Sequence, residues 1–130
     1  AIGAAVARAA TAFGLRVIGV RRSDEPHPDV SICYDATRLL DAIAEADFTV
    51  VCLPLTDATR GWFDARVIDH LPFGSVFINV SEGGIVDEAA VEASLRAGRL
   101  RGAAFAAIPP PERTRLKRHG LSRSSRKDAR

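Results

Sequence analysis

Two short segments contain residue types that could bind a ligand, and each follows an apolar run. Residues 81–84, SEGG, follow the run 76–80, and residues 54–61, PLTDATRG, follow the run 48–53. Both runs are predicted to be β-strands apolar on both faces, as in a parallel sheet that helices cover on each side. Because ligands of open α/β sheets bind beyond the carboxyl ends of the strands, these two segments are the predicted site.

The predicted elements alternate between helix and strand, which is typical of an α/β fold. Helices are predicted over residues 3–13, 36–46, 65–71 and 88–97; the last three follow the capping residues Asp35, Asp64 and Asp87. Strands are predicted over residues 16–20, 48–53, 76–80 and 99–107. Residues 24–34 contain two prolines among charged residues and are predicted to be a surface loop.

Residues 79–88, NVSEGGIVDE, resemble a signature of the D-isomer-specific 2-hydroxyacid dehydrogenases. In that signature an Asn ends a strand and is followed by a small residue, Arg-Gly-Gly and Val-Asp-Glu. Residues 52–61, CLPLTDATRG, and residues 102–106, GAAFA, resemble two further stretches of the same family. The resemblance covers residues 1 to about 108. It implies a Rossmann-like, doubly wound parallel sheet of the α/β class.

The resemblance also implies that this sheet lacks its first strand. The helix predicted over residues 3–13 opens on Gly3, which corresponds to the third glycine of the fingerprint G-x-G-x-x-G. In the strand order 3-2-1-4-5-6 the missing strand is the middle one. The sequence has no methionine and begins Ala1-Ile2-Gly3, so we interpret it as a fragment. We expect the fragment to be marginally stable or unfolded by itself, because two strands lose a neighbour.

The cofactor implied by the resemblance is NADP or NAD. The second strand of such a domain usually ends in an acidic residue that binds the ribose hydroxyls. Here Arg21 and Arg22 follow the strand, and their guanidinium groups suit a ribose 2′-phosphate, which favours NADP. The expected cofactor-binding residues are Ile2, Gly3, Arg21, Arg22, Leu53, Pro54, Thr59, Val80 and Ser81.

The family's reaction is hydride transfer between a nicotinamide cofactor and a 2-hydroxy or 2-oxo acid. It needs an Arg for the substrate carboxylate and a His–Glu pair for the proton. Glu82 occupies the Arg position, and Ala106 stands where an Asp is expected. Glu112 and His119 do not lie at the positions where the family has its Glu and its His. We therefore expect an NAD(P)-binding domain with no intact catalytic set, which is inactive as this fragment.

The net charge divides the sequence into two parts. Residues 1–112 contain ten arginines and fifteen acidic residues, a net charge of −5, whereas residues 113–130 contain eight basic residues and one Asp, a net charge of +7. We assign residues 1–108 to a partial dinucleotide-binding domain and residues 109–130 to a basic, disordered tail, because few large apolar residues occur there. An alternative is a non-catalytic nucleotide-sensing or protein-interaction module with this tail as its contact arm.

The remaining expectations concern partners and location. No apolar run reaches the ~20 residues of a membrane span, and nucleic acid is not expected as a partner because no folded reader accompanies the basic tail. Cys33 and Cys52 lack metal-ligand spacing, so no metal site and a cytoplasmic location are expected. The resemblance implies a homodimeric parent enzyme. It leaves open which 2-hydroxy acid is the substrate.

Overall fold

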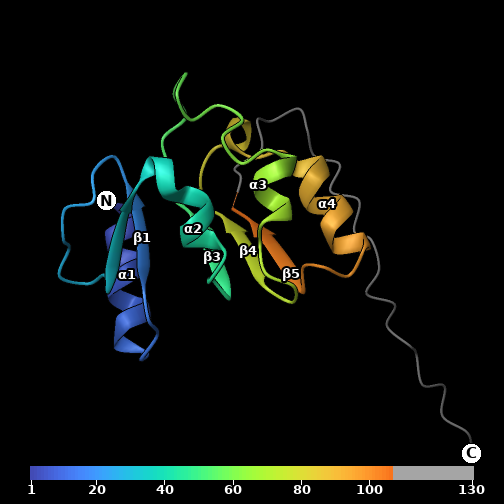
Figure 1. The fold of residues 1–130 in the computed structure, drawn as a ribbon. Coiled ribbons are helices and arrows are strands. Elements are labelled where there is room, and N and C mark those ends of the chain that lie inside the picture. Colours follow the sequence, from blue (N-terminus) through green and yellow to red (C-terminus); the bar gives the residue numbers. More distant parts are fainter. Residues whose placement is uncertain (107–130) are drawn as a thin grey trace, which may run out of the picture.

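The computed structural model describes residues 1–106, so the predicted tail, with Glu112 and His119, lies outside the described residues. The described elements begin with a helix and two consecutive strands, after which helices and strands alternate (Figure 1). In chain order they are α1 (Ile2–Ala12), β1 (Ile18–Arg21), β2 (Ile32–Asp35), the 3-10 helix η1 (Ala36–Arg38), α2 (Leu39–Ile43), β3 (Phe48–Val51), α3 (Ala65–Asp69), β4 (Val76–Asn79), the 3-10 helix η2 (Gly83–Ile85), α4 (Glu88–Arg96) and β5 (Gly102–Phe105).

The described strands form two separate parallel sheets. One contains β1 and β2, and the other contains β3, β4 and β5 in that order. The predicted α/β class with parallel strands is confirmed, but a single continuous sheet is not observed among residues 1–106. Figure 1 shows β1 and β3 as the facing members of the two sheets, with α2 in front of the space between them.

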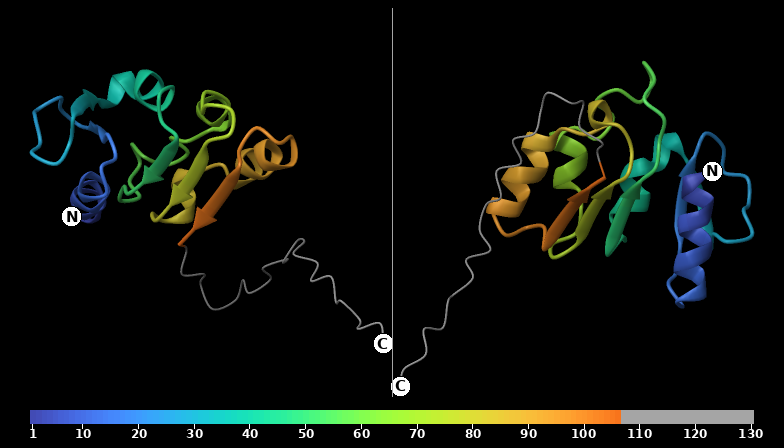
Figure 2. Two further views of the ribbon diagram at one scale, coloured as in Figure 1. Left: turned by 90° about the horizontal axis from the view of Figure 1, so that it is seen from below. Right: turned by 180° about the vertical axis from the view of Figure 1, so that it is seen from behind.

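Most of the buried core lies on one face of the three-stranded sheet. Val51 of β3 and Phe77 of β4 point toward this face, and both are almost fully buried. Helices α3 and α4 pack on the same side (Figure 2). On the other face, Val76 and Ile78 are only half-buried and Phe48 is 50% exposed. The prediction that the run 76–80 is buried on both faces is therefore wrong for the described part of the chain.

The three predicted capping aspartates are confirmed. The side chains of Asp35, Asp64 and Asp87 accept hydrogen bonds from the backbone N–H groups of Thr37, Val67 and Ala90, at 2.8, 2.9 and 3.0 Å. Each carboxylate satisfies a donor that has no partner within its own helix. The helix predicted over residues 36–46 is shorter than expected, because it divides into η1 and α2.

The prediction of a loop over residues 24–34 is wrong at its carboxyl end, where β2 begins at Ile32. The backbone N–H of Ser31 donates to the carbonyl of Val17 at 2.8 Å, and Ile32 pairs with Ile18. Strand β2 has only four residues and none of them is buried. No alternation of apolar and polar residues therefore marks it as a strand in the sequence. Pairing with β1 decides its conformation, since strand propensity depends strongly on context.

None of the helices in residues 1–106 combines the length and the apolar composition that crossing a membrane requires.

Candidate functional site

The chain turns away from the sheet after β3 and again after β4, and one side chain connects the two turns. The Ser81 hydroxyl accepts a hydrogen bond from the Leu53 N–H at 2.6 Å and donates one to the Val51 carbonyl at 3.1 Å. The same carbonyl accepts the Val80 N–H at 3.0 Å. The prediction that the segments following Leu53 and Val80 lie side by side is therefore confirmed.

The loops that leave these two turns remain paired. Gly61 N–H donates to the carbonyl of Gly84 at 2.9 Å, and Phe63 N–H donates to that of Ile85 at 3.0 Å. A Cβ on Gly84 would lie 3.2 Å from both terminal methyl carbons of Leu55, so the absence of a side chain permits this close approach. We refer to residues 52–61 and 79–86, which form one continuous edge at the carboxyl ends of β3 and β4, as the rim.

Two side chains, those of Asn79 and Thr59, have structural roles within the rim that were not predicted. Asn79 is 2% exposed, and its Oδ1 accepts the N–H of Ser81 at 2.9 Å. This bond orients the turn so that the Ser81 hydroxyl reaches β3. The spacing Asn-x-Ser at the end of an apolar run is the available sequence signal, because Asn commonly bonds to the backbone two residues ahead.

Thr59 shapes its own loop. Its hydroxyl donates to the Pro54 carbonyl at 2.7 Å and accepts the N–H of Thr56 at 2.8 Å. These bonds close residues 54–59 into a compact turn on the rim. Any contact of Thr59 with a ligand would therefore compete with bonds that the loop already makes.

The N-terminus of α1 lies next to the rim. A Cβ on Gly3 would lie 3.7 Å from the Cβ of Cys52, and Ile2 is 62% exposed. Ala1 is the N-cap residue and provides no side-chain hydrogen bond to the first turn. Backbone N–H groups and the helix dipole at such an end favour an anionic ligand.

Arg21 and Arg22 lie at the carboxyl end of β1, in the other sheet, and both are exposed. Arg21 donates to the carbonyl of Glu25 at 3.4 Å, a weak bond that leaves most of its donors unused. Asp35 is its partner residue on β2. Hydrogen bonds from Thr37 hold the pKa of Asp35 below its ordinary value, so this carboxyl is ionised at neutral pH and offsets part of the positive charge.

Glu82 is exposed at the N-cap of η2 and makes no side-chain capping bond. A Cβ on the adjacent Gly83 would lie 3.4 Å from a carboxylate oxygen of Glu88, so two carboxylates flank this turn. The Ala106 N–H donates to the Asn79 carbonyl at 2.8 Å, but its methyl side chain provides no polar group. Two carboxylates thus lie beside Gly83, whereas a guanidinium nitrogen of Arg60 lies 3.4 Å from where a Cβ on Gly84 would be.

Cys52 precedes the first turn of the rim and is half-buried. Burial raises the pKa of its thiol, which keeps the side chain protonated at neutral pH and makes it a poor nucleophile. Within residues 1–106, no group of three or more His, Cys, Asp or Glu side chains is arranged to bind a metal ion.

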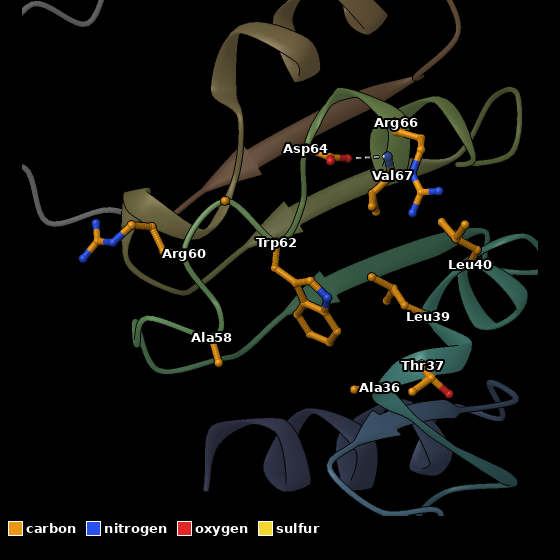
Figure 3. A pocket seen from close by; sticks show the side chains of 11 residues that line it. Ala36, Thr37, Leu39, Leu40, Ala58, Arg60, Trp62, Asp64, Arg66 and Val67 are labelled. Atoms are coloured by element: carbon orange, nitrogen blue, oxygen red, sulfur yellow. Dashed lines mark hydrogen bonds between the residues drawn. The ribbon is translucent and has the colours of Figure 1, made fainter.

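A surface hollow next to the rim contains none of the nine expected cofactor-binding residues. It lies between α2, α3 and the loop that precedes α3, and Trp62 occupies its centre (Figure 3). Arg60 extends away from the other lining side chains in Figure 3. The hollow shares Ala58, Arg60 and Gly61 with the rim but not the residues expected to bind the cofactor. Its lining residues are Ala36, Thr37, Leu39, Leu40, Ala58, Arg60, Gly61, Trp62, Asp64, Arg66 and Val67.

Comparison with known proteins identifies similar sequences and structures. Residues 1–120 match the family "D-isomer specific 2-hydroxyacid dehydrogenase, NAD binding domain". The match continues past Glu112 and so reaches further than the resemblance quoted above. A glyoxylate reductase of Thermococcus kodakarensis is 31% identical over 102 residues, which are 78% of this chain and 31% of that protein.

Two solved structures share the fold. A D-isomer specific 2-hydroxyacid dehydrogenase from Xanthobacter autotrophicus Py2, in complex with NADPH and MES, matches with a TM-score of 0.76 and 39% identity, over 88% of this chain and 37% of that chain. Phosphoglycerate dehydrogenase from Lactobacillus plantarum matches with a TM-score of 0.79 and 31% identity, over 88% and 37% of the two chains. The chain thus spans about a third of the length of these relatives.

Proposed function

Because the chain belongs to the family of D-isomer specific 2-hydroxyacid dehydrogenase NAD-binding domains, we propose that it binds NADP in preference to NAD along the rim and the N-terminus of α1. The observation that carries the proposal is the bond between the Ser81 hydroxyl and the Leu53 N–H. That bond joins the two loops at the carboxyl edge of a parallel sheet, which is where such sheets bind nucleotides.

The residues of the proposed site divide by the part of the cofactor that they suit. The first turn of α1, at Ile2 and Gly3, offers N–H groups to the pyrophosphate. Arg21 and Arg22 offer charged donors to the 2′-phosphate. The nicotinamide half is left to the rim, through Leu53, Pro54, Thr59 and the backbone of Val80 and Ser81.

The reaction that we propose for the enzyme containing this domain is the reversible oxidation of a 2-hydroxy acid to a 2-oxo acid. The bound dinucleotide would supply or accept the hydride at its nicotinamide ring. In this chain Glu82 and Glu88 would repel a substrate carboxylate, so we propose that residues 1–130 alone bind the cofactor without turnover.

A second candidate function is nucleotide sensing without catalysis. Glu82 favours it, because an acidic rim tolerates an uncharged nicotinamide amide better than a substrate anion.

Titration of the 130-residue chain with NADPH and NADH, followed by the fluorescence of the reduced nicotinamide, tests these proposals. We expect saturable binding that is tighter for NADPH, and no loss of fluorescence over time when glyoxylate or hydroxypyruvate is added. Turnover would contradict the proposed inactivity. Absence of binding to a chain shown to be folded by circular dichroism would contradict the cofactor site itself.

A further inference from the structure

The surface hollow between α2 and α3 is lined by Trp62, the only tryptophan of the chain. The hollow has a volume of about 340 Å³. This volume lies at the lower end of the range of small-molecule pockets, roughly 300–1,000 Å³. The size of the hollow therefore suits one small organic molecule.

The indole of Trp62 is held in place from one side. Its ring meets that of Phe63 edge-on, with the ring centroids 5.8 Å apart and the planes at 80°. Phe63 is 4% exposed, and its backbone N–H and carbonyl pair with Ile85 and Asp87. Trp62 itself is only partly buried. The exposed part of the indole is therefore a fixed wall of the hollow, against which an apolar or aromatic group can pack.

Helix α2 provides the apolar side of the hollow. Leu39 is buried in the hydrophobic cluster, and Leu40 is partly buried and packs against that cluster. Figure 3 shows Leu39 next to the indole of Trp62 and Leu40 next to Arg66. Because both leucines already pack against the core, this side of the hollow offers apolar contact to a ligand without a rearrangement of the core.

Two hydrogen-bond donors of the hollow are free to bind a ligand. Neither the indole N–H of Trp62 nor the guanidinium of Arg66 has a hydrogen-bond or ion-pair partner among residues 1–106. Figure 3 shows the nitrogen edge of the indole and the Arg66 guanidinium on the same side of the hollow, beside the two leucines. Donors and apolar surface are thus available together.

The lining side chains that could accept a hydrogen bond already make one. Asp64 accepts the Val67 N–H at 2.9 Å and so caps α3. The hydroxyl of Thr37 donates to the carboxylate of Asp35. The lining side chains include two arginines and one carboxylate, a net charge of +1. A ligand that complements this lining must itself provide acceptors and negative charge.

We propose that the hollow is a binding site for a small carboxylate with an apolar body, such as an aryl-substituted carboxylic acid. The carboxylate accepts hydrogen bonds from the guanidinium of Arg66 and the indole N–H of Trp62. The apolar body lies against the indole ring and the side chains of Leu39 and Leu40. None of these four residues belongs to the proposed cofactor site, so the proposal does not depend on cofactor binding.

The test uses three probes that separate charge from apolar contact. Phenylacetate has both parts, phenylacetamide has the same shape without the charge, and acetate has the charge without the ring. Each probe is titrated into the 130-residue chain without cofactor and at constant ionic strength. Because Trp62 is the only tryptophan, its fluorescence and its indole N–H resonance both report on the hollow.

We expect phenylacetate to shift both signals of Trp62 saturably, and the other two probes to bind at least about tenfold more weakly. Arg66→Gln should weaken the binding of phenylacetate by about tenfold or more, because a hydrogen bond between charged groups is lost. Arg96→Gln is the matched control. It removes the same charge from the exposed side of α4 and should leave the binding of phenylacetate unchanged.

Equal binding of phenylacetate and phenylacetamide would overturn the proposal, and so would equal affinity of Arg66→Gln and the unchanged chain for phenylacetate. Absence of a shift at Trp62, or a shift confined to the amide resonances of Val80 and Ser81, would overturn it as well. Signals of Trp62 that change with protein concentration alone would overturn it in favour of a second copy of the chain in the hollow.

Discussion

Ser81 shows how much of this site depends on single side chains. Its hydroxyl is both acceptor and donor between β3 and the turn after β4, and the residue is 9% exposed. A small residue without a hydroxyl would fit the same volume but would leave the Leu53 N–H without this partner. This hydroxyl therefore joins the two turns, in addition to the backbone hydrogen bonds that Gly61 and Phe63 donate to the loop after β4.

Replacing Ser81→Ala is expected to lower the free energy of unfolding by about 1–3 kcal/mol, because a partly buried N–H loses its partner. Ser75→Ala is the matched control: Ser75 is 3% exposed, and its hydroxyl has no hydrogen-bond partner in the described residues. We expect the control to be neutral or slightly stabilising. Urea unfolding of both variants measures the difference, and equal effects would contradict the role given to Ser81.

Arg21 and Arg22 are expected to decide between the two dinucleotides. Arg21→Gln or Arg22→Gln should weaken NADPH binding by roughly ten- to a hundredfold, because a charge-assisted hydrogen bond contributes roughly 1.5–3 kcal/mol. NADH binding should change little. Arg96→Gln, which removes a positive charge from the exposed side of α4, is the control and should affect neither cofactor. Equal weakening of NADPH and NADH would argue against a 2′-phosphate site.

Glu82→Arg tests whether one charge accounts for the proposed inactivity. The variant removes the carboxylate from the N-cap of η2 and restores the residue type of the family signature. We expect no turnover with NADPH and glyoxylate, since a His–Glu pair for proton transfer is also needed. Glu82→Gln serves as the control for loss of charge alone. A measurable rate in Glu82→Arg would refute the interpretation of the residues that follow 108.

At the scale of elements, the helix caps fix where each loop of the site ends. Asp87 closes the loop that begins at Ser81, because its carboxylate accepts the Ala90 N–H and starts α4. Helix α4 then packs Val91, which is 1% exposed, into the core beneath the sheet. A local hydrogen bond thus marks where the loop between β4 and α4 ends.

Asp87→Ala is expected to destabilise the protein by about 0.5–2 kcal/mol, the usual effect of losing an N-cap. Asp87→Asn should retain most of the stability, because its amide oxygen accepts the same bond. Exchange of the amides in the first turn of α4 reports the local effect. Similar exchange in the two variants would show that the cap is not what begins the helix.

At the scale of the whole molecule, stability is unevenly distributed. The twelve residues of the main hydrophobic cluster lie in α2, in β3 and in the part of the chain that follows β3. Strand β1 contributes only Val20, which is partly buried and packs against this cluster. Phe13, Phe48 and Phe73 are 87, 50 and 81% exposed, so large apolar surfaces are not buried by the described residues. The half that contains α1, β1 and β2 is therefore held by few apolar contacts.

We expect the isolated 130-residue chain to unfold over a broad temperature range, with α1, β1 and β2 losing structure first. The half with α1, β1 and β2 contributes only Val20 to the border of the hydrophobic cluster, so we expect its unfolding to be weakly coupled to that of the other half. Circular dichroism and calorimetry on the same sample measure the transition. A single sharp transition with equal calorimetric and van't Hoff enthalpies would contradict this expectation.

Local features of this protein are determined by the sequence itself. The caps at Asp35, Asp64 and Asp87 join atoms two or three residues apart, so the spacing of the residues is sufficient to predict them. The alternation of helices and parallel strands follows in the same way from runs of apolar residues. The positions of the two loops at the ends of β3 and β4 could also be predicted from these runs.

Only the tertiary structure decided how these elements combine. The bonds from Ser81 to Leu53 and Val51 join residues 28 and 30 positions apart, a range at which no local pattern specifies a partner. Strand β2 exists because β1 pairs with it, and the division into two sheets depends on which edges find a neighbour. Such pairings are chosen by the backbone groups that packing brings together, and residue types alone do not encode them.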